Sequence, residues 1–205
     1  MTNRIYLAST SPRRRDLLRQ IGVHFDPLVF RTGERGEDTD IDESAFDGET
    51  VEHYVERLAL TKAHAGFRRL RWRQLPSNPV LAADTTLSVD GEIVGKPASL
   101  DHAREILARL SGRTHQVLTA VAMSDGERTR SLVSVSEVRF RPLTESQIRH
   151  YLATGESMDK AGAYAIQGRA AMFVEHVSGS HSGIMGLPLC ETATLLATFG
   201  YPLFP

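Results

Sequence analysis

Hydrophobic and polar positions follow two different periods over the first quarter of the chain. Residues 4–10 form a short apolar run typical of a buried strand, and Ser11 followed by Pro12 then marks the start of a helix. Serine caps a helix well, and proline needs no hydrogen-bond partner at the first helical position. Residues 23–30 predict a second strand. Residues 31–48 are polar, acidic and interrupted by glycine, so we expect a loop there.

A longer helix follows, and the pattern then returns to that of strands. Thr50 is a good N-cap, and apolar residues recur at helical spacing from there toward Gly66, where we expect the helix to end. The next apolar run, 80–83, predicts a short buried strand. Residues 87–94 predict two more strands joined at Asp90–Gly91, a dipeptide typical of tight hairpin turns.

The second half of the chain predicts a further helix, a long pair of strands and two more helices. The expected ranges are 99–112 for the helix, 115–123 and 130–140 for the antiparallel strands, and 144–152 and 187–199 for the last helices. Helices mixed with buried and hairpin-linked strands predict an α/β fold with a mixed sheet flanked by helices. No clean linker divides the chain, so we expect one domain over residues 1–205; two lobes would be crossed more than once.

Composition excludes several classes of protein. The 24 Lys and Arg residues balance 25 Asp and Glu residues, and the formal net charge of −1 argues against a general nucleic-acid binder. No stretch approaches the roughly 20 apolar residues that a membrane span needs. The single cysteine, Cys190, rules out an internal disulfide and fits a reducing compartment, so we expect a cytoplasmic protein with an inert, buried thiol. The histidines show no metal-ligand spacing, and His115 is expected to be a hydrogen-bonded structural residue.

Three consecutive arginines, Arg13, Arg14 and Arg15, open the first helix, where the helix dipole disfavours positive charge. A bound anion would explain them, because a helix N-terminus offers unpaired N–H groups and arginine can hold phosphate oxygens in two parallel bonds. Ser9 and Ser11 could add hydroxyl donors. The alternative is that the arginines are solvated and only make the surface soluble.

Four more charged residues are candidates for the same site. Asp84 falls where the apolar run 80–83 ends, and a carboxylate at a strand end can bind a metal ion, act as a general base or simply cap a turn. Lys96 could contact phosphate or be solvated. Lys62 lies on the apolar face of its helix, so it either snorkels to the edge of the core or points into a cleft. Glu43 lies in the acidic loop and is a weak candidate by itself.

Five motifs occur in order along the chain: "LASTSPRRRDLL", "ADTTLSVDGEIVGKP", "LSGRTHQVLTAV", "DKAGAYAIQG" and "GLPL". This succession resembles the Maf (septum formation inhibitor) family of nucleotide pyrophosphatases from residue 5 to about residue 196. The resemblance implies two lobes around a central cleft, distantly similar to inosine triphosphate pyrophosphatases. It also implies hydrolysis of a nucleoside triphosphate to the monophosphate and pyrophosphate with a divalent cation, Mg²⁺ or Mn²⁺.

The resemblance implies roles for particular residues. Asp84 matches the family's proposed catalytic base, and Asp84 and Glu43 are expected to hold the cation. The other matching positions are expected to bind substrate: Ser9, Arg13, Arg14, Lys62 and Lys96. Residues 31–40 look like an insertion ahead of Glu43, so Asp42 or Glu49 could take its part. Arg169 and Ala170 also depart from the usual pattern and could alter the cleft rim.

Three positions indicate which base is preferred. Arg13, Thr85 and Gln167 match the branch that acts on dTTP and UTP, whereas the 7-methylguanosine triphosphate branch tends to show tryptophan after "SP", "SDQ" and "SEG". The amide of Gln167 can both donate to and accept from a base edge, and Thr85 could shape the pocket floor. We therefore expect a dTTP/UTP pyrophosphatase, possible as a homodimer. The alternatives are a 7-methyl-GTP pyrophosphatase and a non-catalytic nucleotide-binding regulator of septum formation.

Overall fold

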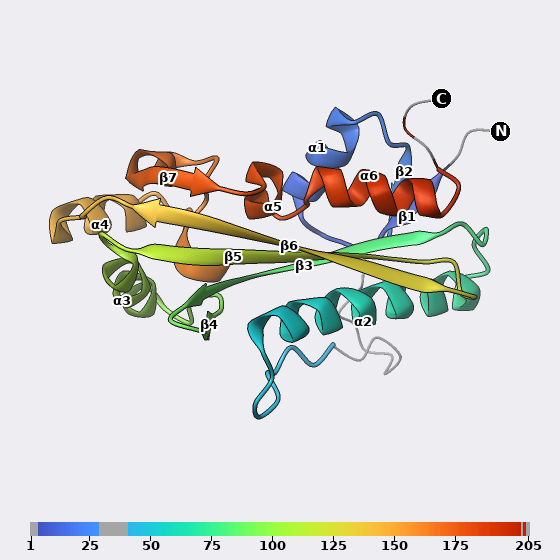
Figure 1. Cartoon of the computed structure of the whole chain (residues 1–205), viewed down its shortest axis with the longest axis horizontal. Helices are drawn as coiled ribbons and strands as arrows, with labels where there is room; N and C mark the ends of the chain where they lie inside the picture. Colours follow the sequence, from blue (N-terminus) through green and yellow to red (C-terminus); the bar gives the residue numbers. More distant parts are fainter. Residues whose placement is uncertain (1–3, 29–40, 202, 204–205) are drawn as a thin grey trace.

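One mixed sheet runs the length of the molecule in the computed structural model, which describes residues 4–28, 41–201 and 203 (Figure 1). The strands are β1 (Ile5–Leu7), β2 (Phe25–Pro27), β3 (Val80–Val89), β4 (Glu92–Val94), β5 (Thr114–Ser124), β6 (Thr129–Phe140) and β7 (Val174–Ser178). Their order is β2-β1-β3-β5-β6-β7, and β4 pairs with β3. Because β1 is parallel to β2 and β3 while the other pairs are antiparallel, the predicted mixed sheet is confirmed.

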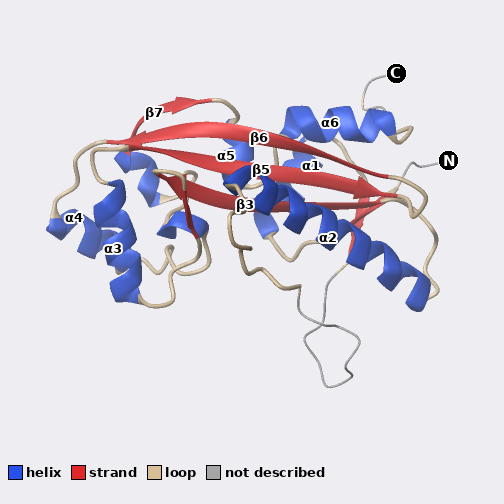
Figure 2. Ribbon diagram, turned by 60° about the horizontal axis from the view of Figure 1, so that its bottom comes forward, coloured by secondary structure: helices blue, strands red, loops and turns tan. Residues whose placement is uncertain are grey.

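Helices cover both faces of the sheet at one end and gather into a second group at the other (Figures 1 and 2). They are α1 (Pro12–Gln20), α2 (Val51–Trp72), α3 (Leu100–Leu110), α4 (Glu145–Leu152), α5 (His181–Met185) and α6 (Leu189–Thr198), with short 3₁₀ turns η1 (Ala161–Ala163) and η2 (Arg169–Phe173). No helix in the described part of the chain is long and apolar enough to cross a membrane.

Three apolar clusters occupy the spaces between the sheet and these helices. Ala63 of α2 packs with Val80 and Ala82 on one face of β3. On the opposite face, Leu81 packs with apolar residues of α1 and α6. The third cluster holds the far end of β3, including Leu87, together with α3 and α4. The long strands β3, β5 and β6 thus connect both ends of the molecule.

The prediction that a strand ends at Asp84 is wrong. β3 continues without a break from Val80 to Val89, and Asp84 lies in its interior opposite Ala120 of β5. Two β-branched threonines follow Asp84 and favour extended backbone, and β5 supplies hydrogen-bond partners along the whole strand. The polar residues in the middle of β3 therefore mark the place where the strand lines a cavity, not its end.

Helix α2 also extends beyond its predicted end. It runs to Trp72, and Gly66 lies inside it, buried against the sheet. A Cβ atom at Gly66 would come within 2.7 Å of Val80 Cγ1 and 3.2 Å of Ala8 Cβ. Glycine is needed here for the close approach of α2 to β1 and β3, and not as a helix stop.

Several smaller predictions can be compared with the structure. Asp90 and Gly91 form the expected hairpin turn, both with positive φ, and the helix expected from residue 144 begins with a capping box of Thr144 and Gln147. His115 is buried and bonded to the Tyr164 hydroxyl, so its structural role is confirmed. Cys190 is exposed, however, so the expectation of a buried thiol is wrong: it lies on the outer side of α6, whose buried residues include Thr192, Leu195 and Leu196. The suggested insertion, residues 31–40, lies outside the described residues.

Candidate active site

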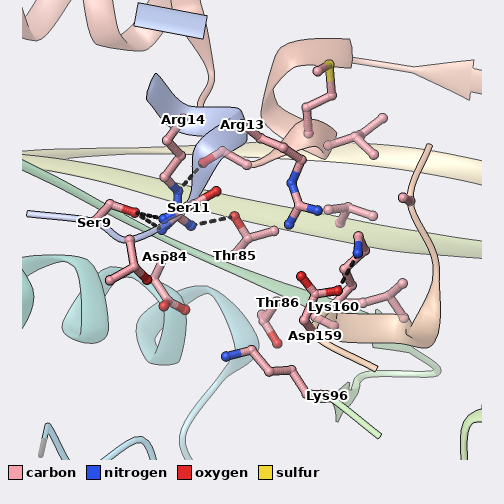
Figure 3. Close-up of a pocket in the computed structure, with 18 of the residues that line it drawn as sticks. Ser9, Ser11, Arg13, Arg14, Asp84, Thr85, Thr86, Lys96, Asp159 and Lys160 are labelled. Carbon is pink, nitrogen blue, oxygen red and sulfur yellow. Dashed lines mark hydrogen bonds and ion pairs between the residues drawn. The ribbon is translucent and has the colours of Figure 1, made fainter. Parts of the chain in front are cut away.

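A cavity of about 770 Å³ opens at the middle of the sheet, between the two groups of helices (Figure 3). Segments far apart in sequence line it: the β1–α1 turn, α2, the middle of β3, and the chain from residue 159 to residue 167. Nine of the residues considered in the sequence are among its lining residues: Ser9, Arg13, Arg14, Glu43, Lys62, Asp84, Thr85, Lys96 and Gln167. The structure therefore brings these nine together in one place.

The alternation of side chains along β3 distributes its polar residues between two walls of the cavity. Successive residues of a strand point to opposite faces. Asp84 continues the face of Val80 and Ala82, which pack under α2, and its carboxylate meets Lys62 of that helix. Thr85 faces the other way and meets Arg14 of α1. One strand thus presents a carboxylate to one wall and a hydroxyl to the other.

Lys62 points into the cleft and holds two carboxylates together. Its Nζ lies 2.5 Å from Asp84 Oδ1 and 2.7 Å from Glu43 Oε1. Burial raises the pKa of Glu43, but the hydrogen bond and charge of Lys62, together with the charges of Lys96 and Arg14, lower it below its usual value overall. Glu43 is therefore an ionised carboxylate that faces the cations of the cavity.

Contacts between the acidic loop and α2 leave Glu43, and not Glu49 or Asp42, facing the cavity. Glu49 accepts two hydrogen bonds from Arg57, at 2.6 and 2.7 Å, and its side chain is only 8% exposed. Asp42 accepts a hydrogen bond from the backbone of Ser44. The hydroxyl of Tyr54 donates to the Glu43 carbonyl at 2.9 Å. Of the three acidic residues considered from the sequence, Glu43 alone lines the cavity among the described residues.

Arg14 is held in place by three hydrogen bonds. Its Nε donates to the Gly186 carbonyl at 2.7 Å, and its two terminal nitrogens donate to Thr85 Oγ1 at 3.2 Å and Ser9 Oγ at 3.4 Å. Burial lowers the pKa of Arg14, and the charge of Asp84 opposes that shift. Arginine remains charged in such surroundings, so Arg14 offers a fixed positive charge to an anion. Arg15, in contrast, turns away and donates to the carbonyl of Thr10.

Further cations approach the same space from other elements. Arg13 projects from α1, and Lys96 projects from the connection between β4 and α3 (Figure 3). Lys160 also lines the cavity; its Nζ donates to the Glu156 carbonyl at 2.8 Å and pairs with Asp159. Asp159 and Lys160 belong to the "DKAG" motif, but sequence reasoning gave them no role, because their position opposite Arg13 and Lys96 follows only from the fold.

The remaining wall of the cavity is apolar and was also missed. Its side chains come from β3, β5, α5 and the segment after η1, and they end next to Gln167: Leu87, Val117, Tyr164, Ile166, Ile184 and Met185. In the sequence, the spacing of these apolar residues does not differ from that of residues in a hydrophobic core. The cavity is therefore divided into a cationic half, suited to phosphates, and an apolar half, suited to the flat face of a base or a sugar.

Asp84 and Glu43 are the carboxylates of the cavity that could hold a divalent cation. In the described part of the chain, no group of three or more His, Cys, Asp or Glu residues is placed to hold a metal ion. Mg²⁺ at nucleotide sites is typically bound by one or two carboxylates together with substrate phosphates. Asp84 and Glu43 supply two such carboxylates, and they lie close together because both accept a hydrogen bond from the Lys62 ammonium. The donor set fits a cation shared with a polyphosphate and does not fit a metal held by the protein alone.

The fold and the cavity together define an α/β protein with a cleft suited to a nucleoside polyphosphate. The chain belongs to the Maf family: the family model described as "Maf-like protein" matches residues 4–199. The dTTP/UTP pyrophosphatase of Aromatoleum aromaticum is 69% identical over 98% of this chain and 97% of its own. Those of Dechloromonas aromatica and Chromobacterium violaceum are 54% and 51% identical, over 97% and 98% of this chain and 98% and 96% of their own.

One solved structure is similar over nearly the whole chain. The structure of the Staphylococcus aureus Ham1 protein matches 96% of this chain and 97% of its own, with a TM-score of 0.49 and 17% sequence identity.

Proposed function

We propose that this protein hydrolyses dTTP and UTP to the nucleoside monophosphate and pyrophosphate. The observation that carries the proposal is the convergence of Lys62, Asp84 and Glu43 in a cavity that Arg13 and Arg14 also line. The names of relatives that are 51–69% identical over nearly the whole chain support the same substrates. The cavity of about 770 Å³ is within the usual size range for a site that encloses a small ligand.

Binding of the triphosphate is assigned to the cationic half. A nucleoside triphosphate carries about four negative charges, and phosphoryl-transfer sites stabilise such charge with positioned cations. Arg14 is already oriented by its three hydrogen bonds, so little reorganisation is needed when phosphate oxygens arrive. Arg13 and Lys96 approach from opposite sides, and their positive charges can stabilise the negative charge that develops on the departing pyrophosphate.

Cleavage of the bond between the α- and β-phosphates is assigned to Asp84. As a general base, its carboxylate would take the proton of the attacking water while the phosphoanhydride bond breaks and pyrophosphate leaves. Asp84 is 8% exposed, so the reaction would occur where bulk water is largely excluded. A divalent cation, held by Asp84 and Glu43, would neutralise phosphate charge when bound.

Preference for thymine and uracil is assigned to the apolar half. Gln167 stands at the end of the apolar wall, and its amide offers both a donor and an acceptor to a base edge. Gln167 is exposed in the free protein, so a bound base would cover its amide, and a mismatched base would leave that covered amide unpaired. Gln167→Glu keeps the shape and removes the donor, so it should reduce the preference for dTTP. Unchanged selectivity would show that Gln167 does not read the base.

The test of the reaction is pyrophosphate release from dTTP, UTP, CTP, ITP and 7-methyl-GTP, with Mg²⁺, with Mn²⁺ and with chelator. Cation-dependent release from dTTP and UTP above the rest is the expected result. Release from 7-methyl-GTP or ITP instead would keep the reaction and overturn the assigned base preference. No release from any of them would favour a non-catalytic nucleotide-binding regulator. Action on free nucleotides in the cytoplasm and assembly as a homodimer are part of the same proposal.

A further inference from the structure

Thr119 lies next to the site but does not line the cavity. It is on β5, opposite Thr85 of β3, and none of its surface is exposed. A buried hydroxyl needs hydrogen-bond partners, because leaving it unpaired costs free energy. Thr119 has two: its Oγ1 donates to the Gly183 carbonyl at 2.7 Å, and it lies 2.9 Å from Thr85 Oγ1.

The chemistry of these groups fixes the direction of every hydrogen bond between them. A hydroxyl has one proton, and a carbonyl can only accept, so the Thr119 proton goes to Gly183. Thr119 must then accept from Thr85, whose single proton is thereby used. Thr85 in turn accepts from Arg14, since a guanidinium can only donate. We call this chain, from Arg14 through Thr85 and Thr119 to the Gly183 carbonyl, the hydroxyl relay.

The hydroxyl relay closes on itself through helix α5. The Gly186 N–H donates to the same Gly183 carbonyl at 2.9 Å, and the Gly186 carbonyl accepts from Arg14 Nε at 2.7 Å. Gly186 caps α5 with a φ of 116°, and its carbonyl points toward Arg14. Residues other than glycine rarely adopt this backbone conformation. The closed circuit therefore joins α1, β3, β5 and α5.

This circuit changes the meaning of Thr85. Its one proton is used by Thr119, so the hydroxyl has no proton left to donate to a bound base, and its oxygen accepts from Arg14. The bond from Arg14 gives Thr85 a role in orienting that guanidinium. Resting on the function proposed above, we propose that Thr119 is a positioning residue: through Thr85 it sets the plane of the Arg14 guanidinium that binds the triphosphate.

The experiment uses Thr119→Val, which keeps the shape of the side chain and removes the hydroxyl, and Thr119→Ser, which keeps the hydroxyl. Thr192→Val is the matched control. Thr192 is equally buried and also donates to a carbonyl at 2.7 Å, that of Pro188, but it lies in α6 and does not line the cavity. Thr119→Ala removes the same hydroxyl if valine disturbs folding, and circular dichroism checks that each variant is folded.

Binding of inorganic tripolyphosphate is measured by calorimetry in the presence of chelator. The measurement then reports how Arg14 contributes to phosphate binding, without divalent cations and without nucleotide hydrolysis. We expect Thr119→Val to weaken binding about tenfold, because a misplaced guanidinium loses part of a charge-assisted hydrogen bond. Thr119→Ser should restore most of the affinity, and Thr192→Val should bind like the wild type. Thr85→Val should weaken binding to a similar degree, and the Thr85→Val, Thr119→Val double variant should be no weaker than either single variant.

Other outcomes overturn the inference. Wild-type affinity in Thr119→Val, multiplied losses in the double variant, failure of serine to rescue, or no tripolyphosphate binding by the wild type would each do so. The dTTP assay separates this inference from the proposed function. If the wild type does not hydrolyse dTTP but Thr119→Val still weakens tripolyphosphate binding, the inference holds and the proposed function fails. If the wild type hydrolyses dTTP, and Thr119→Val matches Thr192→Val in both hydrolysis and tripolyphosphate affinity, the proposed function holds and the inference fails.

Discussion

Arg57 holds Glu49 in a two-pronged ion pair, with Nε 2.6 Å from Oε1 and a terminal nitrogen 2.7 Å from Oε2. The same guanidinium donates to the Ser44 carbonyl and lies 4.0 Å from the centre of the Phe46 ring. Arg57 therefore fastens the acidic loop to α2 at several points at once. Glu43 belongs to the same loop and faces Lys62.

We predict that Arg57→Met acts through Glu43. Without the ion pair the loop loses its attachment, so the concentration of Mg²⁺ needed for half-maximal activity should rise by about tenfold, an effect typical of lost charge-assisted hydrogen bonds. The measurement is a cation titration of dTTP hydrolysis in wild type, Arg57→Met, Glu43→Gln and the double variant. Since both single changes remove the same contribution, the double variant should resemble Glu43→Gln. Effects that multiply would indicate an independent role for Arg57.

Arg104→Met is the matched control for that experiment, because Arg104 pairs with Glu145 at an exposed position away from the cavity. Such surface pairs contribute little. A similar change in cation requirement in this control would mean that the effect of Arg57 is not specific to the acidic loop. Hydrogen exchange of the 41–50 segment in cation-free protein gives a second readout, and it should be faster in Arg57→Met.

We predict that Asp84→Asn abolishes most hydrolysis while nucleotide binding persists. The amide cannot take a proton from water, and loss of a general base typically costs about 10²- to 10⁴-fold in rate. Turnover is measured with dTTP, and binding by calorimetry. Asp90→Asn provides the control, since Asp90 lies in the β3–β4 turn and pairs with Arg113 outside the cavity. Turnover near the wild-type level in Asp84→Asn would remove Asp84 from the mechanism.

We predict that His115 makes stability depend on pH. Burial lowers its pKa from the usual 6.5 to about 4, because the charged ring would lose its solvation among Phe140 and Tyr164. Between these values the unfolded chain binds the proton and the folded chain does not. The contribution of His115 to the free energy of unfolding is therefore complete above pH 6.5. It falls by up to about 3 kcal/mol as the pH drops toward about 4.

The measurement is urea denaturation between pH 4.5 and 7.5 for wild type and His115→Phe. The variant is expected to be less stable at pH 7.5, because the Tyr164 hydroxyl loses its partner, but to show a smaller decline toward acid. His150→Gln, a change at an exposed histidine of α4, should decline as the wild type does. Parallel curves for wild type and His115→Phe would show that His115 is not the titrating group.

We predict that Gly66→Ala destabilises the protein by about 1–3 kcal/mol, the usual cost of overpacking a core. In an open helix the same change would stabilise by about 1 kcal/mol. The sign reverses because the new methyl group would meet Val80 Cγ1 at 2.7 Å and push α2 away from the sheet. Urea denaturation measures the effect, with Ala65→Gly as a change of the same size at a less buried neighbouring position. A more stable Gly66→Ala would contradict the close packing.

Local signals explain what the sequence could predict. The N-cap at Thr50 and the Asp90–Gly91 turn depend on residues a few positions apart, and the structure contains both. The polar stretch after an apolar run correctly drew attention to Asp84. Its position inside β3 was missed, because only pairing with β5, more than thirty residues later, keeps that strand extended through its polar centre.

The rest of the site depends on contacts that no short window contains. Lys62 could be placed on the inner face of its helix, but the sequence did not decide between the edge of the core and the cleft until Asp84 and Glu43 were seen beside it. The Gly186 carbonyl that accepts from Arg14 left no signal in the sequence, because it is a backbone group. Thr119, which bonds Thr85, left none either, because it looks like an ordinary strand residue.

The bond between Arg14 and the Gly186 carbonyl spans 172 positions of the chain. During synthesis the arginine is therefore made long before the carbonyl that orients it. Until Gly186 has been made, Arg14 lacks the backbone partner that fixes its Nε. The orientation of this guanidinium is therefore completed late in synthesis relative to the arginine itself.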